Sequence, residues 1–290
     1  NVTHIAQLES LPNVIRAAPP MPQSSLRSAG WQLAAPDVLA LMEKLRSVGT
    51  PLGTYVGGKL FYGIKTGLNE AFVIDQATRD RLIAADPNSA DVIKPWLRGQ
   101  DVKRWRTNFA DLYVIFTRRG IRIDDYPALK EYLMQFKAQL TPGALDGRKP
   151  GTYEWYEIQD NIAYFPEFDK PKIVWGNLAT RPQFALDETK VYVSAPANLI
   201  SADDVYYLIA LLNSQIADYL IKAQGATRQG GYIEYKPMYV GQIPIPTVTP
   251  EVRAEIESRV RELLALRGQG AAVAALEAEL NERVYRAYGL

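Results

Sequence analysis

The run Tyr55-Val-Gly-Gly-Lys-Leu-Phe-Tyr-Gly-Ile-Lys-Thr-Gly-Leu-Asn-Glu-Ala-Phe-Val-Ile74 alternates apolar residues with glycine and polar residues. An alternation with a period of two is typical of paired strands that bury one face. Further strand-like segments occur near residues 112–116, 153–158, 172–177, 183–186, 191–194 and 243–246. Because these segments are short and irregularly connected, they predict mixed or antiparallel sheets and not a doubly wound parallel sheet with a cofactor crevice.

Several helices are expected around these strands. A short helix begins at Pro36, and Asp75 is placed to cap a helix that follows it. Pro127 falls in the first turn of another helix, where its missing N–H costs nothing. Ser201 and Asp204 have the spacing of a capping box at the start of an apolar helix that extends to about residue 222.

The last part of the chain changes character. Two amphipathic segments follow Thr249 and are separated by Gly268 and Gly270, which predicts an αα-hairpin. The expected fold class is therefore α+β, a mixed or antiparallel strand-rich body with surrounding helices and a C-terminal helical hairpin. We expect a leader with a short helix over residues 1–48, the strand-rich body over 49–247, and the hairpin over 248–290, either packed on the body or projecting from it.

Composition excludes several classes of protein. The 290 residues include no cysteine and a single histidine, His4, so disulfides, zinc knuckles and cysteine nucleophiles are ruled out. A Ser-His-Asp triad would depend on His4, in a leader rich in Ala, Pro, Ser and Gln. No apolar run approaches the roughly 18 to 20 residues of a membrane span, and no export signal is evident, so we expect a cytoplasmic protein without a membrane contact. The chain begins with Asn1, which suggests a piece of a longer protein.

Catalytic motifs are weak. Residues 53–60 nearly match a phosphate-binding loop, but Leu60 stands where a Mg²⁺-binding hydroxyl belongs and a strand-like segment follows. Glu188-Thr-Lys190 is the second half of a metal-dependent nuclease signature, whose other half would be the distant Pro36-Asp37. The sequence contains neither Asn-Pro-Pro-Tyr nor an S-adenosylmethionine loop of the Phe-x-Gly-x-Gly type.

A series of segments, in order along the chain, carries a family resemblance. The segments are residues 61–74, 93–105, 113–117, 155–157, 170–174, 211–214, 230–232, 243–246 and 285–290. Together they resemble the TaqI-like C-terminal specificity domain, which follows the catalytic domain in type IIG restriction-modification enzymes and related N6-adenine-specific DNA methyltransferases. The resemblance extends over about residues 30 to 290.

The resemblance implies a function for the chain. In this family the catalytic domain carries Asn-Pro-Pro-Tyr, so the resemblance implies a non-catalytic DNA target-recognition domain that binds no cofactor itself. The parent protein would use S-adenosyl-L-methionine, with Mg²⁺ if it also cleaves DNA. The implied partners are double-stranded DNA and the methyltransferase domain of the same parent chain, with a dimer or subunit contact through residues 249–290. Two alternatives stay open, an assembly or specificity-subunit module and a metal-dependent nuclease.

The candidate DNA-binding residues fall into two sets. Between Lys94 and Arg122 there are eight Lys and Arg against two Asp, a charge excess that suits a phosphate backbone, although a solvated basic face is the alternative. The phosphate-contact candidates are Arg98, Lys103, Arg104, Arg106, Arg148, Lys149 and Lys222. The base-reading candidates are Gln224, Arg228 and Gln229 in a glycine-rich loop, with Asn177 and Arg181 beside Gln183 as a second group. Trp105 is expected to pack beneath the basic residues, and the glycine-rich loop could also be a plain surface turn.

Overall fold

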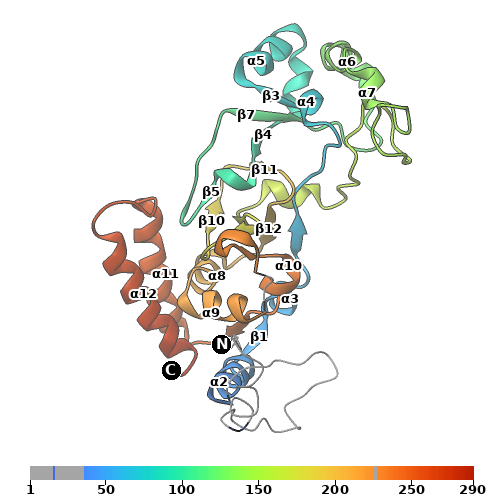
Figure 1. Ribbon diagram of the computed structural model, residues 1–290. Coiled ribbons are helices and arrows are strands. Elements are labelled where there is room, and N and C mark those ends of the chain that lie inside the picture. Colours follow the sequence, from blue (N-terminus) through green and yellow to red (C-terminus); the bar gives the residue numbers. More distant parts are fainter. Residues whose placement is uncertain (1–15, 17–35, 225–226) are drawn as a thin grey trace.

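The computed structural model of the protein describes residue 16, residues 36–224 and residues 227–290 (Figure 1). The predicted leader and His4 therefore lie largely outside the described residues, although the short helix expected at Pro36 is present as α2. Two four-stranded sheets organise the rest of the chain, and helices cover them on the outer sides (Figure 1).

The helices and strands have the following bounds. The α-helices are α2 (Pro36–Ser47), α3 (Leu52–Tyr55), α4 (Asn69–Phe72), α5 (Gln76–Ala85), α6 (Pro127–Met134), α7 (Lys137–Leu140), α8 (Val205–Leu212), α9 (Gln215–Gln224), α10 (Pro237–Val240), α11 (Pro250–Ala265) and α12 (Val273–Ala287). The 3-10 helices are η3 (Pro87–Asp91), η4 (Gly99–Asp101), η5 (Ile123–Asp125), η6 (Phe165–Asp169) and η7 (Gln229–Gly231). The strands are β1 (Gly49–Pro51), β2 (Leu60–Tyr62), β3 (Val73–Asp75), β4 (Ile93–Leu97), β5 (Val102–Lys103), β6 (Arg106–Thr107), β7 (Leu112–Ile115), β8 (Lys172–Trp175), β9 (Leu178–Ala179), β10 (Phe184–Asp187), β11 (Tyr192–Val193), β12 (Asn198–Ser201), β13 (Ile233–Glu234) and β14 (Pro244–Pro246).

The central sheet separates two hydrophobic cores. Its strand order is β10-β8-β12-β2, and every neighbouring pair is antiparallel. Because successive side chains of a strand point to opposite faces, Trp175 belongs to one core and Val174 to the other. Ile200 and Leu199 of β12 divide in the same way. Both faces of this sheet are therefore buried.

The second sheet forms the other part of the molecule, with the order β11-β4-β7-β3 and α4 to α7 around it (Figure 1). Its β4–β7 and β7–β3 pairs are antiparallel, whereas β11 runs parallel to β4. The mixture of antiparallel and parallel pairs, with short connections and surrounding helices, confirms the predicted α+β class. Three two-stranded ladders complete the structure, β1 with β14, β5 with β6, and β9 with β13.

The C-terminal hairpin packs on the body. Ile256 and Val260 of α11 and Val284 of α12 are fully buried in the same core as the apolar helix α8. Of the two expected arrangements, a packed and a projecting hairpin, the structure has the packed one (Figure 1). The apolar stripe of the hairpin is thus already covered by its own chain.

Local helix signals were predicted with mixed success. Asp75 caps α5 by accepting a hydrogen bond from the Thr78 amide at 2.8 Å, and Pro127 opens α6, so both predictions are confirmed. The capping box at Ser201 and Asp204 is wrong, because Ser201 ends β12 and the Asp204 carboxylate instead accepts from Tyr55 and Arg253. The single helix predicted to about residue 222 is divided into α8 and α9.

Two other expectations concern loops. Strand β2 begins at Leu60, so the sequence that resembles a phosphate-binding loop leads into a strand, as predicted. Residues 153–158 form turns and not the strand that the sequence suggested.

None of the described helices is both long enough and apolar enough to traverse a bilayer.

Candidate nucleic-acid interface

The β5–β6 hairpin presents two cations side by side. Lys103 and Arg106 are paired across the ladder, so their side chains leave the same face. The turn between them contains Trp105 in the left-handed region, with φ of 67°. The indole is 2% exposed and its backbone N–H donates to the Phe184 carbonyl at 3.0 Å, which confirms that Trp105 packs beneath the basic residues.

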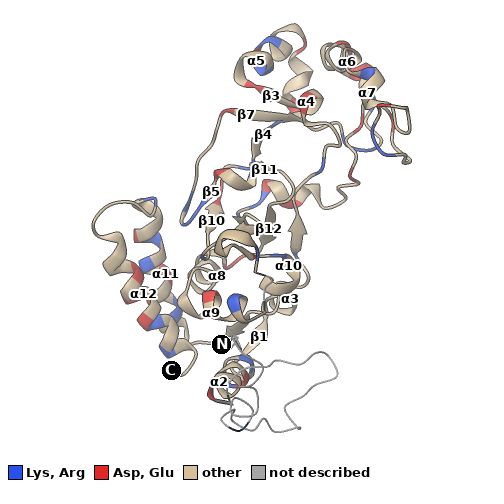
Figure 2. Cartoon of the chain, in the orientation of Figure 1, with Lys and Arg blue, Asp and Glu red and all other residues tan. Residues whose placement is uncertain are grey.

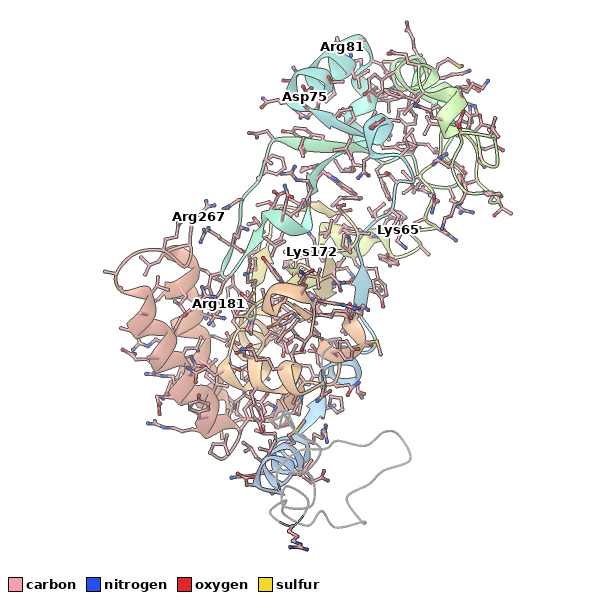
Figure 3. The ribbon with its side chains drawn as sticks, in the orientation of Figure 1. Lys65, Asp75, Arg81, Lys172, Arg181 and Arg267 are labelled. Carbon is pink, nitrogen blue, oxygen red and sulfur yellow. The ribbon has the colours of Figure 1, made fainter. Side chains whose placement is uncertain are left out.

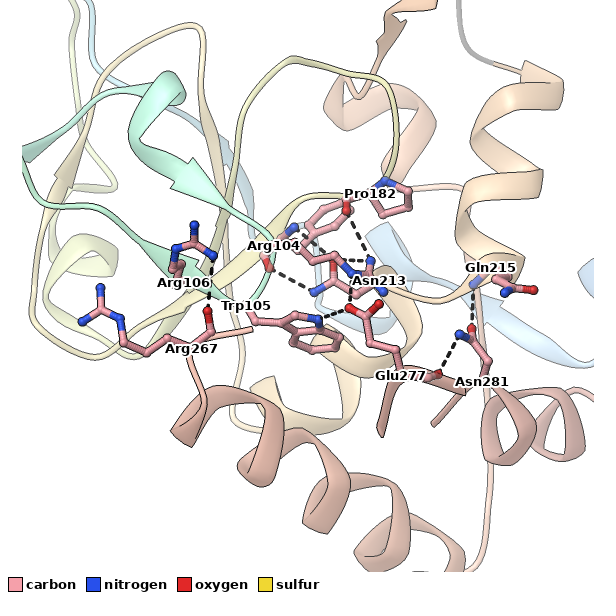
Figure 4. A network of polar contacts seen from close by, with 10 residues as sticks. Arg104, Trp105, Arg106, Pro182, Asn213, Gln215, Arg267, Glu277 and Asn281 are labelled. Carbon is pink, nitrogen blue, oxygen red and sulfur yellow. Dashed lines mark hydrogen bonds and ion pairs between the residues drawn. The ribbon is translucent and has the colours of Figure 1, made fainter. Parts of the chain in front are cut away.

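Arg104, the other turn residue, is held inside the protein. Its Nε donates to Glu277 of α12, and its Nη1 lies 3.3 Å from both the Pro182 carbonyl and Asn213 Oδ1 (Figure 4). The same Glu277 oxygen accepts from Trp105 Nε1 at 2.5 Å. Burial lowers the pKa of Arg104, and the Glu277 carboxylate opposes that effect. Arg104 is therefore a structural residue, and its prediction as a phosphate contact is wrong.

The turn between α11 and α12 braces the same hairpin. Arg106 Nη1 lies 3.3 Å from the Arg267 carbonyl (Figure 4). Arg267 Nη2 in turn donates to the Thr107 carbonyl at 3.1 Å. Gly268 has a φ of 59°, and a Cβ built on it would come within 2.9 Å of the Arg104 carbonyl. The C-terminal hairpin thus fixes the turn that carries Lys103 and Arg106.

These elements surround a groove of about 410 Å³, which we call the basic groove. It is lined by Lys103, Arg104, Trp105, Arg106, Arg181, Gln183, Gly268, Gly270, Val273, Ala274 and Glu277. Arg267 lines the adjoining depression together with Trp105 and Arg106. Figure 2 shows basic residues at the β5–β6 turn, and Figure 3 places Arg181 and Arg267 near the turn of the α11–α12 hairpin.

The basic groove carries an excess of positive charge. Among the described contacts, Lys103, Arg106 and Arg181 form no ion pair with a carboxylate. The acidic group in the lining, Glu277, is already paired with Arg104. Since paired charges largely cancel, the field of the groove is positive and attracts anions.

The glycine-rich loop is joined to this surface through the β9–β13 ladder. Glu234 of β13 pairs with Leu178 of β9, which places the loop around Arg228 beside the segment from Asn177 to Arg181. The structure therefore brings together the two base-reading groups that the sequence presented as separate. Arg228 and Gln229 are exposed, and Gln224 ends α9 at the base of the loop.

The other predicted phosphate contacts are dispersed. Arg98 forms a two-point contact with Asp101, at 2.8 Å for both nitrogens, and Lys222 pairs with Asp218 at 2.7 Å. Arg148 is 5% exposed and donates to carbonyl oxygens of Leu140, Thr66, Glu157, Glu154 and Trp155. Its prediction as a clamp on DNA is wrong, because all of its donors point into the protein. Lys149 is exposed next to it.

The basic stretch of residues 94–122 does not form one patch. Arg118 and Arg119 lie over the rings of Phe165 and Tyr153, and Arg122 pairs with Asp125, all beyond β7 and away from the β5–β6 turn. Sequence reasoning missed Arg267 and Glu277 as part of the site. The glycines between α11 and α12 indicated a surface loop. Nothing in the sequence indicated that this loop contacts the β5–β6 turn, which lies some 160 residues earlier in the chain.

The family model of the TaqI-like C-terminal specificity domain matches residues 94–245, just over half of the chain. The chain belongs to this family. The match runs from β4 to β14 and includes the β5–β6 hairpin, Arg181 and the Arg228 loop. The α11–α12 hairpin, which supplies Arg267 and Glu277, lies beyond the matched residues of the specificity domain.

Two relatives extend the comparison. The specificity domain is 22% identical over 232 residues to the Type II methyltransferase M.MjaIV of Methanocaldococcus jannaschii, covering 77% of this chain and 76% of the relative. It also resembles the solved structure of the Type IIL restriction-modification enzyme MmeI in complex with DNA, with a TM-score of 0.59 at 15% identity over 80% of this chain. The chain spans about a third, 32%, of the length of that structure's chain, and the likeness shows a shared fold.

The nuclease alternative gains no support from the described part of the chain. Within residues 36–224 and 227–290, no three or more His, Asp and Glu side chains gather where they could hold a metal ion. Glu188, in the segment that resembles half of a nuclease signature, accepts a hydrogen bond from the Tyr206 hydroxyl at 3.0 Å.

Proposed function

We propose that this specificity domain is the DNA target-recognition module of a restriction-modification methyltransferase. The observation that carries the proposal is the basic groove, in which Lys103, Arg106 and Arg181 form no ion pair among the described contacts and Glu277 is paired with Arg104. An exposed cation without a carboxylate partner is free to neutralise a phosphate and release a condensed counterion. Arg228 and its neighbours lie on the adjoining β9–β13 ladder, where a base edge can be reached.

The structure supports a division of labour within this surface. Lys103 and Arg106 stand on a hairpin fixed by Glu277 and by the α11–α12 turn, so a phosphate meets a preformed pair of charges. A preformed site loses little conformational entropy on binding. Lys149 and Lys222, which lie elsewhere on the surface, are proposed as peripheral contacts with DNA.

For the parent protein, we propose N6-adenine methylation with S-adenosyl-L-methionine as the methyl donor, in an enzyme of type IIG that requires Mg²⁺ if it also cleaves DNA. The family and the similarity to a Type II methyltransferase support this proposal. The present sequence contains no Asn-Pro-Pro-Tyr and no Phe-x-Gly-x-Gly loop, so we propose that the chain itself neither binds the cofactor nor transfers the methyl group. Calorimetric titration with S-adenosyl-L-methionine is expected to give no heat of binding, and a micromolar isotherm would contradict this.

The proposed partners are double-stranded DNA and the methyltransferase domain of the same parent. A dimer or subunit contact through residues 249–290 would have to use the outer face of the hairpin, because its inner face is buried against α8. Light scattering of the intact chain over a range of concentrations tests this contact. A monomer mass that stays constant as the concentration rises would contradict the proposed dimer contact.

Salt-dependent DNA binding tests the main proposal. Lys103→Ala, Arg106→Ala and Arg181→Ala are each expected to weaken binding to every duplex about equally and to lower the slope of log K against log salt by about 0.9. Arg81→Ala is the matched control, since Arg81 is an exposed arginine that lies away from Arg181 and Arg267 (Figure 3). Equal slopes for the control and the groove variants would refute the assignment of the groove.

A further inference from the structure

The guanidinium of Arg228 is paired with one oxygen of the Glu234 carboxylate, and Lys236 is paired with the other oxygen. Its Nε and Nη2 both donate to Glu234 Oε1, at 2.8 and 2.5 Å, while Lys236 Nζ lies 2.7 Å from Glu234 Oε2. The Glu234 side chain is 7% exposed in strand β13, whereas that of Arg228 is 55% exposed. The buried carboxylate is fixed through both oxygens, and the guanidinium it holds faces outward.

This contact decides which edge of the guanidinium is presented to solvent. A guanidinium has five N–H donors, one on Nε and two on each terminal nitrogen. With Nε and Nη2 directed at Glu234, the free donors are those of Nη1 and the second N–H of Nη2, and the Arg228 guanidinium has no other partner among the described contacts. The free edge therefore carries two parallel N–H groups, which match the O6 and N7 acceptors of guanine in the major groove.

The backbone around this contact is fixed as well. The Arg228 amide donates to the Tyr232 carbonyl at 2.7 Å, and Thr227 bridges to Ile233. The tip of the turn, Gly230 and Gly231, takes positive φ angles of 76°, and a Cβ on Gly231 would meet nothing within 4 Å. Arg228 thus stands at the closed base of a turn whose tip is slim enough for close approach to DNA.

We infer that Glu234 is a specificity-determining residue that orients Arg228 to read guanine, an inference that rests on the proposed DNA-recognition function. For attraction to DNA alone the carboxylate is unfavourable, because a negative charge near DNA repels every phosphate. Its position under Arg228 is explained by geometry, since a guanidinium that is already oriented loses less rotamer entropy when it pairs with a base. The two effects have opposite signs and can be separated by experiment.

The experiment begins with selection of a preferred duplex from a random pool by the wild-type chain. Fluorescence anisotropy then measures binding to the preferred duplex, to versions in which single guanines are replaced by 7-deazaguanine, and to a scrambled duplex. At one guanine the loss of the N7 acceptor is expected to weaken wild-type binding about 3- to 10-fold. Glu234→Gln and Arg228→Lys are expected to abolish most of this difference. Glu234→Gln should leave scrambled-duplex binding unchanged or tighter.

Glu262→Gln is the matched control, because Glu262 is paired with Arg259 through both carboxylate oxygens at 2.7 and 2.9 Å on α11. It is expected to keep the full 7-deazaguanine difference. Should circular dichroism show that Glu234→Gln lowers the folded fraction, Glu234→Asp takes its place, since it keeps the buried charge and withdraws it by one methylene. The expected outcome is the same.

The outcomes distinguish this inference from the function on which it rests. If the wild-type chain selects and binds a duplex but Glu234→Gln, or its substitute, retains the wild-type difference, the role of Glu234 is overturned and the DNA-recognition function stands. If Arg228→Lys retains the difference, another residue reads the guanine. If the wild-type chain binds no duplex at all, the proposed function fails and takes this inference with it.

Discussion

Replacing Glu277 by alanine is expected to destabilise the protein and to loosen the β5–β6 hairpin. The substitution removes the acceptor of both Arg104 Nε and Trp105 Nε1. Breaking a buried ion pair from one side costs about 3–5 kcal/mol, because a charge is left inside without a partner. The side chains of Arg104 and Glu277 are 13% and 20% exposed, so partial access of water reduces the cost, and we expect about 3 kcal/mol.

Thermal unfolding followed by circular dichroism measures this loss. For a domain of this size a change of about 3 kcal/mol corresponds to a fall in Tm of roughly 5–10 °C. Glu277→Gln keeps an oxygen acceptor but loses the charge, and we expect about half the effect. Glu279→Ala is the control, because Glu279 lies on the same helix in exposed ion pairs, and its loss should change stability by less than about 1 kcal/mol.

The pH dependence gives an independent check. Burial acts to raise the pKa of Glu277, but the hydrogen bond and charge of Arg104 outweigh it, so the net pKa lies below the ordinary glutamate value. The unfolded chain therefore takes up this proton first on acidification. The Arg104–Glu277 pair contributes its full stability above about pH 4.5, and this contribution is lost as the pH falls through the lowered pKa of Glu277. In this range the free energy of unfolding of Glu277→Gln should therefore depend less on pH than that of the wild type.

DNA binding separates a bracing role from simple electrostatics. Removing Glu277 adds one positive charge to the basic groove, which by Coulomb attraction alone would tighten binding. We expect weaker binding instead, because Lys103 and Arg106 lose the fixed turn that presents them. An unchanged Tm together with tighter DNA binding would show that Glu277 does not brace the hairpin.

The remaining predictions concern stability elsewhere in the chain. Asp187→Ala should cost about 3–5 kcal/mol in chemical denaturation, because it leaves the fully buried Lys172 without its partner. Arg148→Ala should lower the free energy of unfolding by about 3 kcal/mol, since five hydrogen bonds to backbone carbonyls are lost, and should leave the salt slope of DNA binding unchanged. Gly268→Ala should reduce both the Tm and DNA affinity, because its Cβ would press on the Arg104 carbonyl from a left-handed backbone, at a cost of about 1–3 kcal/mol. A wild-type Tm for this last variant would contradict the close packing of the α11–α12 turn.

Features that depend on neighbouring residues were predictable from the sequence. The N-cap at Asp75 acts on the amide three residues ahead, so the sequence that encodes the cap also places its partner. The amphipathic hairpin and the family also follow from order along the chain. The alternation over residues 55–74 was a weaker guide, because β2 and β3 belong to different sheets and α4 lies between them, so the predicted pairing of strands within this run is wrong.

The wrong predictions concern residues that interact with segments far away in the sequence. Ser201 was expected to cap a helix, but β12 is enclosed between β8 and β2, and strand pairing takes the residue into the central sheet. Asp204 was expected to complete the capping box, but it accepts from Arg253, 49 residues later. Local propensity was overridden by contacts that no short segment contains.

The candidate site shows the same division. The sequence determined how many cations the β5–β6 region carries, but it did not determine which of them are free, because the partner of Arg104 is 173 residues away. Likewise the sequence offered two groups of base-reading residues, and only the β9–β13 ladder joined them. A side chain's type fixes its chemistry, whereas its availability depends on the groups that folding brings against it, and those groups were decided by the tertiary structure.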